Sequence, residues 1–141
     1  MNFWDTSALV ALDTGGKHGD SVRRTLEEDG SVSLWWGAHV EYAAAVSRRE
    51  RERLLTAQQA ATLLRRFNTL AQSCHEVQPA PRIRLLAQRL LRVHPLKAAD
   101  ALQLAAALTV AEDDPASIGF VCLDTRLNRA AAREGFTILG L

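Results

Sequence analysis

Short apolar runs alternate with longer helix-like stretches along the whole 141-residue chain. Runs this brief, bounded by glycine, polar or charged residues, are typical of β-strands. We predict strands at residues 2–4, 32–36, 76–77, 119–123 and 136–139. Strands that alternate with helices form a mostly parallel sheet with helices on both faces. This pattern predicts an α/β fold in which each crossover between parallel strands is right-handed.

The segments between the strands have the composition and end signals of helices. We predict helices at residues 6–12, 18–29, 38–53, 56–71, 81–93, 97–111 and 125–134. Thr56 is a suitable N-cap, and Gly30 and Gly135 mark expected helix ends. No repeat, linker or low-complexity tract divides the chain, so residues 1–141 are predicted to form a single domain.

The charge of the chain is distributed unevenly. Its net charge is +1, but residues 42–99 carry 11 Lys and Arg against 3 Asp and Glu, a net of +8. The remaining residues carry 6 against 13, a net of −7. A basic middle segment is expected to favour a polyanionic partner, although solvated helix faces would give the same pattern.

The cysteines and the apolar stretches indicate the class of protein. The two cysteines, Cys74 and Cys122, suggest neither a disulfide framework nor a zinc site, which favours the reducing cytosol. The N-terminus lacks the basic region of a signal peptide, and we expect none. The longest uncharged apolar stretch is far shorter than the ~20 residues of a membrane span, so no membrane association is expected.

Four acidic residues stand in apolar surroundings, where charged side chains are rarely found unless paired or metal-bound. Asp5 follows the first predicted strand, and Asp124 follows the fourth. Glu41 falls near the start of the helix after the second strand, and Asp100 in the first turn of its own helix. Ligands bind beyond the carboxyl ends of strands in sheets of this kind. All four acids are therefore predicted to reach the same edge of the sheet.

Converging carboxylates need a cation. Two of them about 4–5 Å apart repel by roughly 4 kcal/mol at an effective dielectric near 20. Mg²⁺ and Mn²⁺ prefer oxygen ligands, and Mg²⁺ is commonly held by one or two carboxylates together with phosphate oxygens. The acids and the basic middle segment together predict metal-dependent hydrolysis of phosphodiester bonds.

Each acid also has a purely structural explanation. Asp5 and Asp124 each precede a predicted helix and could serve as its N-cap, and Thr6 or Ser7 could cap while orienting Asp5. Glu41 could lie on a solvent-facing stripe, and Asp100 could be a favourable charge in a first helical turn. The sequence does not decide between these explanations and a shared site.

Several stretches resemble PIN-domain proteins, and in particular the VapC toxins of bacterial toxin–antitoxin pairs. The matching parts are Asn2–Ala8, Glu41 after the second strand, Leu96–Ala105 and Phe120–Leu127. This resemblance spans essentially the whole chain and implies a three-layer α/β/α sandwich. Many relatives have histidine three residues after the third acid, where this chain has Gln103.

The resemblance implies a function. Asp5 and Asp100 match the principal metal-binding acids, and Glu41 and Asp124 match the other two members of a catalytic quartet. It implies a cytoplasmic Mg²⁺- or Mn²⁺-dependent endoribonuclease in which a metal-activated water attacks an RNA phosphate. It also implies a homodimer that is inhibited by a cognate VapB-type antitoxin.

The main alternative is a PIN-like module that binds RNA or protein without cutting it. An aspartyl phosphatase would need a second Asp at position 7, where this chain has Ser7. The arginine-rich segment is the expected RNA surface, although the antitoxin or the second subunit would suit it equally. Its candidate residues are Arg48, Arg49, Arg51, Arg53, Arg82, Arg89 and Arg92.

Overall fold

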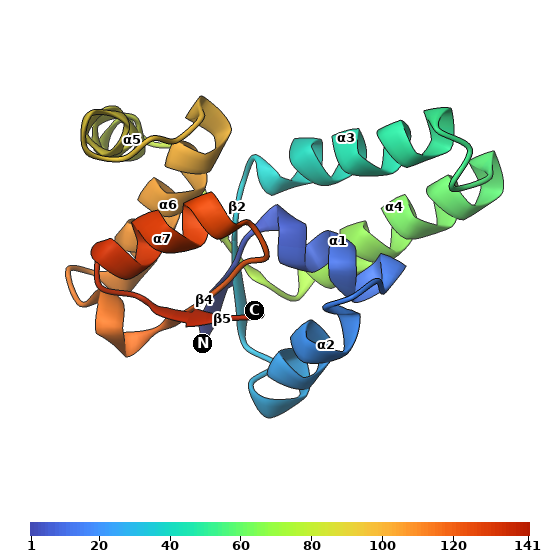
Figure 1. Ribbon diagram of the computed structural model, residues 1–141, viewed down its shortest axis with the longest axis horizontal. Coiled ribbons are helices and arrows are strands. Elements are labelled where there is room, and N and C mark those ends of the chain that lie inside the picture. Colours follow the sequence, from blue (N-terminus) through green and yellow to red (C-terminus); the bar gives the residue numbers. More distant parts are fainter.

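The computed structural model describes residues 1–141 and confirms a three-layer α/β/α sandwich (Figure 1). The strands are β1 (Asn2–Trp4), β2 (Val32–Trp35), β3 (His75–Val77), β4 (Gly119–Val121) and β5 (Thr137–Leu139). The helices are α1 (Thr6–Thr14), α2 (Gly19–Glu28), α3 (Ala38–Arg51), α4 (Ala57–Gln72), α5 (Pro81–Val93), α6 (Ala98–Ala111) and α7 (Thr125–Arg133). All the predicted elements are present, with ends that differ by a few residues. A short 3₁₀ turn at Pro115–Ser117 was not predicted.

The five strands form one parallel sheet in the order β3-β2-β1-β4-β5. The chain moves outward from β1 through β2 to β3, and then returns to the other side of β1 for β4 and β5. The order of the strands thus reverses between β1 and β4. Such a switch point is where open α/β sheets bind ligands.

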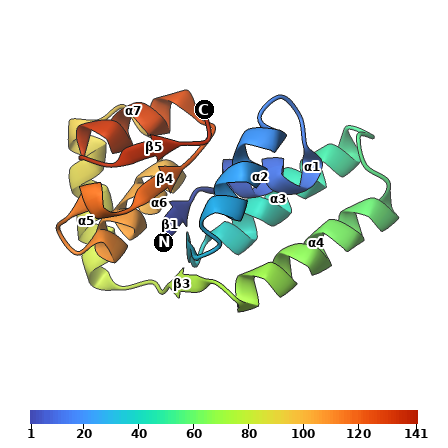
Figure 2. The ribbon, with the colours of Figure 1, turned by 90° about the horizontal axis from the view of Figure 1, so that it is seen from below.

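Neighbouring side chains of the short central strand supply two separate apolar cores. Phe3 faces a cluster formed with α5, α6 and α7, in which its ring stacks on Phe120 at a centroid distance of 5.7 Å. Trp4 faces the opposite cluster, formed with α1 to α4. The two sets of helices lie on opposite sides of the sheet, as Figures 1 and 2 show. This alternation follows from the period of two in a β-strand.

Local signals determine where the helices begin and end. Thr56 and Gln59 form a capping box at the start of α4, as the N-cap prediction requires. Two predicted helix ends need small corrections. Asp29 rather than Gly30 is the C-cap of α2, and Glu134 rather than Gly135 is the C-cap of α7. Gly135 follows with a φ of 106°, a conformation that glycine adopts without strain.

None of the helices is both long and apolar enough to cross a bilayer. Both cysteines are free, in agreement with the prediction that they form no disulfide.

We predict that Gly119→Ala destabilises the sheet by about 1–3 kcal/mol, because the added methyl group overpacks the interior. A Cβ at this position would lie 2.5 Å from both Asn2 Oδ1 and Leu139 Cδ1, on the two neighbouring strands. Chemical denaturation measures the effect. The control is Gly30→Ala, whose Cβ would meet only Leu26 O at an ordinary 3.7 Å. Equal stability of the two variants would contradict the prediction.

Candidate functional site

The four acids lie at the carboxyl edge of the sheet, around the switch point. Asp5 directly follows β1, and its backbone N–H donates to Val121 O of β4 at 2.9 Å. Asp124 follows β4 after two residues and begins α7. Glu41 lies in the first turn of α3, directly after β2, and Asp100 in the first turn of α6. The topology therefore brings together residues that are up to 119 positions apart in the sequence.

Asp5 is the most enclosed of these acids, with an exposed fraction of 5%. Its Oδ2 accepts hydrogen bonds from the backbone N–H of Ser7 at 3.0 Å and from the Ser7 hydroxyl at 2.6 Å. The Cys122 thiol lies 3.5 Å from the same oxygen. Burial raises the pKa of Asp5, while these hydrogen bonds oppose the rise. Asp5 thus caps α1 and also stays fixed at the switch point.

Glu41 is held by an amide from the opposite layer of helices. Gln103 of α6 donates through Nε2 to Glu41 Oε2 and to Thr6 Oγ1, each at 3.0 Å. Burial, followed by the negative charge of Asp5 and then that of Asp100, raises the pKa of Glu41 to about 7. The hydrogen bond from Gln103 works against this rise. The pKa of this carboxyl group therefore lies near neutral pH.

The charge of Asp100 interacts with the charges of the other three acids. Burial raises its pKa, and the charges of Asp5 and Asp124 raise it further. Lys97 and Arg126 lower it, so they are the cations that act on the site. None of the four acids forms a salt bridge with a cation of the chain. The carboxylates repel one another without a fixed positive partner.

The capping explanation for Asp5 and Asp124 is correct, and it is compatible with a shared site. Asp124 Oδ1 accepts the backbone N–H of Leu127 at 2.9 Å, which caps α7. Each of the two carboxylates uses one oxygen for its cap. The other oxygen makes no hydrogen bond to the chain and is free to bind a ligand.

The residues offer oxygen ligands that suit a divalent cation, but they do not form a complete coordination shell. No group of three or more His, Cys, Asp or Glu side chains is arranged as a ready set of metal ligands. Mg²⁺ does not require one, because it usually keeps several waters and takes one or two carboxylates from the protein. The unpaired, mutually repelling carboxylates of Asp5, Glu41 and Asp100 provide the oxygen ligands that such an ion prefers.

Several supporting residues were not assigned a site role from the sequence. Gln103 was only noted as a departure from related sequences, yet it is fully buried and bridges α1 and α3. Cys122 is buried, and its sulfur lies near Asp5 Oδ2 and accepts the N–H of Asp124 at 3.3 Å. The spacing of Asp100 and Gln103, one helical turn apart, is the signal that places both on one face.

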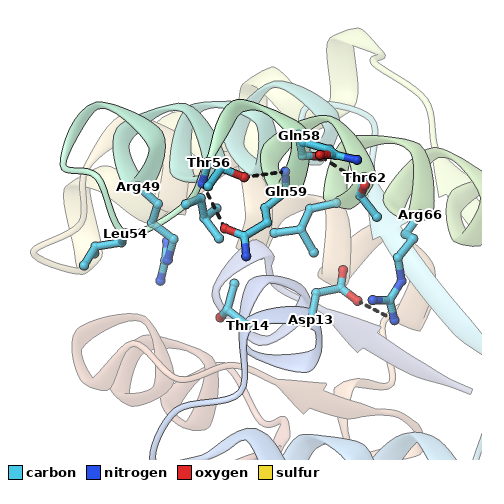
Figure 3. Close-up of a pocket in the computed structure, with 11 residues that line it drawn as sticks. Asp13, Thr14, Arg49, Leu54, Thr56, Gln58, Gln59, Thr62 and Arg66 are labelled. Atoms are coloured by element: carbon cyan, nitrogen blue, oxygen red, sulfur yellow. Dashed lines mark hydrogen bonds and ion pairs between the residues drawn. The ribbon is translucent and has the colours of Figure 1, made fainter.

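An open pocket lies away from the acids. It has a volume of about 710 Å³ and is lined by residues of α1, α3, α4 and the turn between α3 and α4 (Figure 3). Asp13 forms its floor, with one oxygen 2.6 Å from the Tyr42 hydroxyl and the other 3.6 Å from Arg66. The arginines at the end of α3 also lie away from the site. Arg51 is ten residues beyond Glu41, or about 15 Å along the helix axis.

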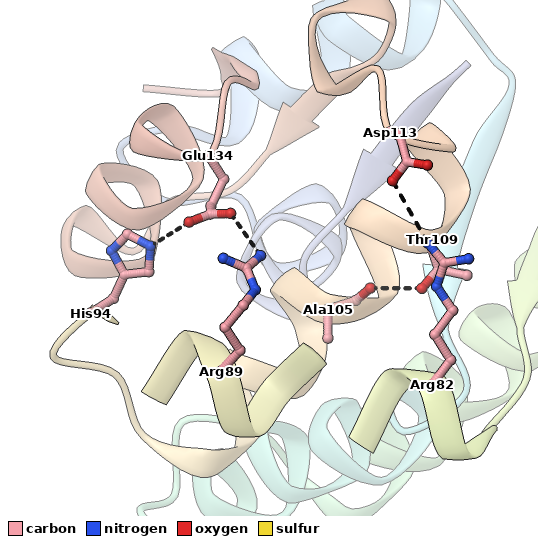
Figure 4. A network of polar contacts seen from close by, with 7 residues as sticks. All are labelled: Arg82, Arg89, His94, Ala105, Thr109, Asp113 and Glu134. Atoms are coloured by element: carbon pink, nitrogen blue, oxygen red, sulfur yellow. Dashed lines mark hydrogen bonds and ion pairs between the residues drawn. The ribbon is translucent and has the colours of Figure 1, made fainter. Parts of the chain in front are cut away.

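A second cluster of polar side chains stabilises the turn before α6. His94 is buried, and its Nε2 lies 2.8 Å from Glu134 Oε2, while Arg89 donates to Glu134 Oε1 at 3.0 Å (Figure 4). The hydrogen bonds from His94 and Arg89 lower the pKa of Glu134 against the effect of burial, which is the largest single influence. His94 therefore has a structural role. It anchors the turn from which α6 carries Asp100 to the site.

Solved structures with this fold include bacterial toxins. No known family profile and no curated protein matches the sequence. VapC20 of Mycobacterium tuberculosis, described as a sarcin-ricin loop cleaving toxin, matches with a TM-score of 0.68 and 19% identity, covering 97% of each chain. VapBC2 of Rickettsia felis, bound to a promoter DNA fragment, matches with a TM-score of 0.67 and 14% identity over 97% of this chain and 96% of that one.

FitAcB from Neisseria gonorrhoeae matches with a TM-score of 0.67 and 16% identity over 99% of this chain and 96% of that one. At these identities the similarity establishes the fold. The chain has the PIN-like fold of the VapC-type structures, as its sequence motifs predicted.

We predict that Glu41→Gln stabilises the protein at pH 8 in the absence of divalent cations, but has little effect at pH 5. Folding raises the pKa of Glu41 from 4.5 to about 7, so native wild type loses stability as the pH rises through that window. The loss is at most about 3 kcal/mol before solvent screening reduces it. Glutamine cannot ionise and removes this loss. Thermal melts of both proteins across pH 5–8 test the prediction, which an equal pH dependence would contradict.

Proposed function

We propose that the chain is a metal-dependent endoribonuclease that acts as the toxin of a toxin–antitoxin pair. One feature supports the proposal: Asp5, Glu41, Asp100 and Asp124 stand directly after strands or in the first turns of helices along the carboxyl edge of a PIN-like sheet, and none of them forms a salt bridge with a cation of the chain. This fold is shared with a toxin described as cleaving the sarcin-ricin loop. The proposed reaction is hydrolysis of RNA phosphodiester bonds.

The residues of the proposed site would have different roles in the reaction. Asp5 and Asp100 would be the principal holders of Mg²⁺ or Mn²⁺, with Glu41 and Asp124 completing the quartet. When bound, such a cation activates water and neutralises charge on the leaving oxygen. Glu41, with a pKa of about 7, is suited to accept and release a proton near neutral pH. Lys97 and Arg126, whose charges already act on Asp100, would attract the RNA phosphates.

The partners follow from the same proposal. Two of the similar structures are toxin–antitoxin assemblies by description, which supports a VapB-type antitoxin as the inhibitor of this chain. We also propose a homodimer. Leu85, Leu91 and Val93 are exposed apolar residues of α5 and suit a subunit contact. Both RNA cleavage and antitoxin control are expected to take place in the cytoplasm.

We predict that Asp100→Asn reduces RNA cleavage by more than about 100-fold while the protein stays folded. Loss of even an outer partner of a metal ligand costs roughly 10–100-fold, and a direct ligand is expected to cost more. Mapping of cleavage ends on total cellular RNA measures the activity, and circular dichroism checks the fold. The matched control is Asp20→Asn, because the Asp20 side chain is 93% exposed and pairs only with Arg23. Full cleavage by Asp100→Asn would refute the site.

RNA binding without any cleavage by wild type would favour the non-catalytic binding module instead.

We further predict that Mn²⁺ or Mg²⁺ raises the melting temperature of wild type. A ligand that binds only the native state stabilises it by about 2.7 kcal/mol at 100 times its dissociation constant. Here it also relieves the repulsion that raises the pKa of Glu41 and Asp100. Asp5→Asn should lose most of this response, whereas Asp20→Asn should keep it. A melt of wild type that is unchanged by millimolar Mn²⁺ would count against a metal site.

A further inference from the structure

A small apolar pocket lies where the ends of β2 and β3 meet the starts of α5 and α6. It has a volume of about 360 Å³ and is lined mainly by Trp35 at the end of β2, by Pro79 and Pro81 before and at the start of α5, and by Arg84 and Leu102. Leu102 lies two residues after Asp100 on α6, which places the two side chains on different faces of the helix, and Trp35 directly precedes the turn into the helix of Glu41. The pocket and the acid site are therefore built from the same two elements, β2 and α6, but open from different faces of α6.

The position of the Trp35 indole depends on Gly37. A Cβ at position 37 would overlap Trp35 Nε1 and lie 2.9 Å from its Cδ1. The backbone of Gly37 has an ordinary φ of −70°, so this glycine is not required by the turn itself. What requires it is the close approach of the indole. Glycine at this position leaves room for an aromatic wall next to the first turn of α3.

A second indole extends the aromatic surface outward. Trp36 is 48% exposed and packs edge-on against Trp35, with ring centroids 6.3 Å apart. Its backbone N–H donates to Val77 O at 3.0 Å, which fixes the residue at the edge between β2 and β3. An exposed tryptophan held by a sheet is a rigid surface on which a planar group can stack.

The charge around the pocket is positive. Residues 78–99 contain no Asp or Glu, and five Lys or Arg: Arg82, Arg84, Arg89, Arg92 and Lys97. Arg82 and Arg89 pair with Asp113 and Glu134, but Arg84 forms no salt bridge. An unpaired guanidinium at the mouth of an apolar pocket suits a ligand with a flat apolar part and an attached anion. A nucleotide has both.

We propose that this pocket binds a nucleobase of a single-stranded RNA substrate. This inference rests on the proposed function and adds the form in which the RNA is recognised. The base enters between Trp35 and the proline walls, Arg84 contacts a phosphate, and the adjoining base stacks on Trp36. Single-stranded segments fit because only an unpaired base can leave its own stack and enter a pocket.

The size and the walls of the pocket agree with this ligand. Its volume is near the lower end of the roughly 300–1,000 Å³ typical of ligand pockets. Pro79 and Pro81 offer no backbone N–H and have little conformational freedom to lose when a base is bound. The arrangement therefore favours stacking over recognition of one particular base edge, and a tolerance for different bases is expected.

The test uses RNA oligonucleotides in which a single abasic nucleotide is placed at each position in turn. Affinity is measured without divalent cations, so that it reports on the pocket whether or not the chain cleaves RNA. For wild type, removing the base at one position should weaken binding by roughly 5- to 150-fold, the effect expected for one stacked base. Removal of the other bases, apart from the adjoining one, should have a small effect.

The matching variant is Ala80→Phe, which fills the pocket from an exposed position in its wall. It should weaken the binding of intact RNA by a similar factor. In this variant, removing the base at the sensitive position should cause no further loss of affinity, because both changes abolish the same contact and their effects are therefore not additive. Gln88→Phe on the next turns of α5 lies outside the pocket and serves as control. Arg84→Ala should reduce the slope of affinity against salt by about one.

Three results would overturn the inference: equal affinity of wild type for all abasic substrates, additive effects of Ala80→Phe and base removal, or a change in oligomeric state caused by Ala80→Phe. The last, measured by light scattering, would make the pocket part of a protein interface. Cleavage is measured separately with Mn²⁺ present. If the pocket binds a base but the protein never cleaves RNA, only the proposed function is refuted. If the protein cleaves RNA but the effects of Ala80→Phe and base removal are additive, only the pocket inference is refuted.

Discussion

The position of Asp5 is the constraint on which the site depends. β1 is the central strand of the sheet, and the residue that follows it must lie at the switch point between β1 and β4. A buried carboxylate there is unfavourable unless it is hydrogen-bonded. The chain meets this requirement with Ser7, which donates through both its backbone N–H and its hydroxyl. The same contacts begin α1, so the cap of a helix and the anchor of the site are one structure.

Repulsion between the acids is not cancelled by any cation of the chain. Asp5 raises the pKa of both Glu41 and Asp100, and Asp124 raises that of Asp100. No arginine or lysine forms an ion pair that would cancel this effect. If a salt bridge neutralised one of the carboxylates, the native state would be more stable, but a metal ion would then gain less free energy on binding. The unrelieved charge supports the proposal that a divalent cation would stabilise the native state.

The sequence could predict the edge at which the acids meet, but not the contacts between them. Asp5 and Asp124 follow strands, and the rule that parallel strands end at one edge is enough to bring them together. The bridge from Gln103 to Thr6 joins residues 97 positions apart, and no local pattern indicates it. The prediction that the arginine-rich end of α3 forms an RNA, antitoxin or dimer surface stays a prediction. Composition identified a basic segment, but the length of α3 places those arginines far from Glu41.

The site also forms the seam between two halves of the molecule. Asp5 and Glu41 belong to the half whose core lies under α1 to α4, and Asp100 belongs to the half under α5 to α7. The sheet separates these two cores, so contact between the two sets of helices is possible only around its edges. Gln103 provides that contact at the carboxyl edge, because it leaves α6 and donates to Thr6 and Glu41 on the opposite side.

His94 and Glu134 hold the other end of the same arrangement, where they tie the turn before α6 to the end of α7. Asp100 therefore sits between two fixed points, the His94 anchor before it and the Gln103 bridge one turn after it. A carboxylate that is repelled by its neighbours would otherwise move away from them. The two contacts therefore limit how far Asp100 can move away from Asp5 and Asp124, whose charges act on it.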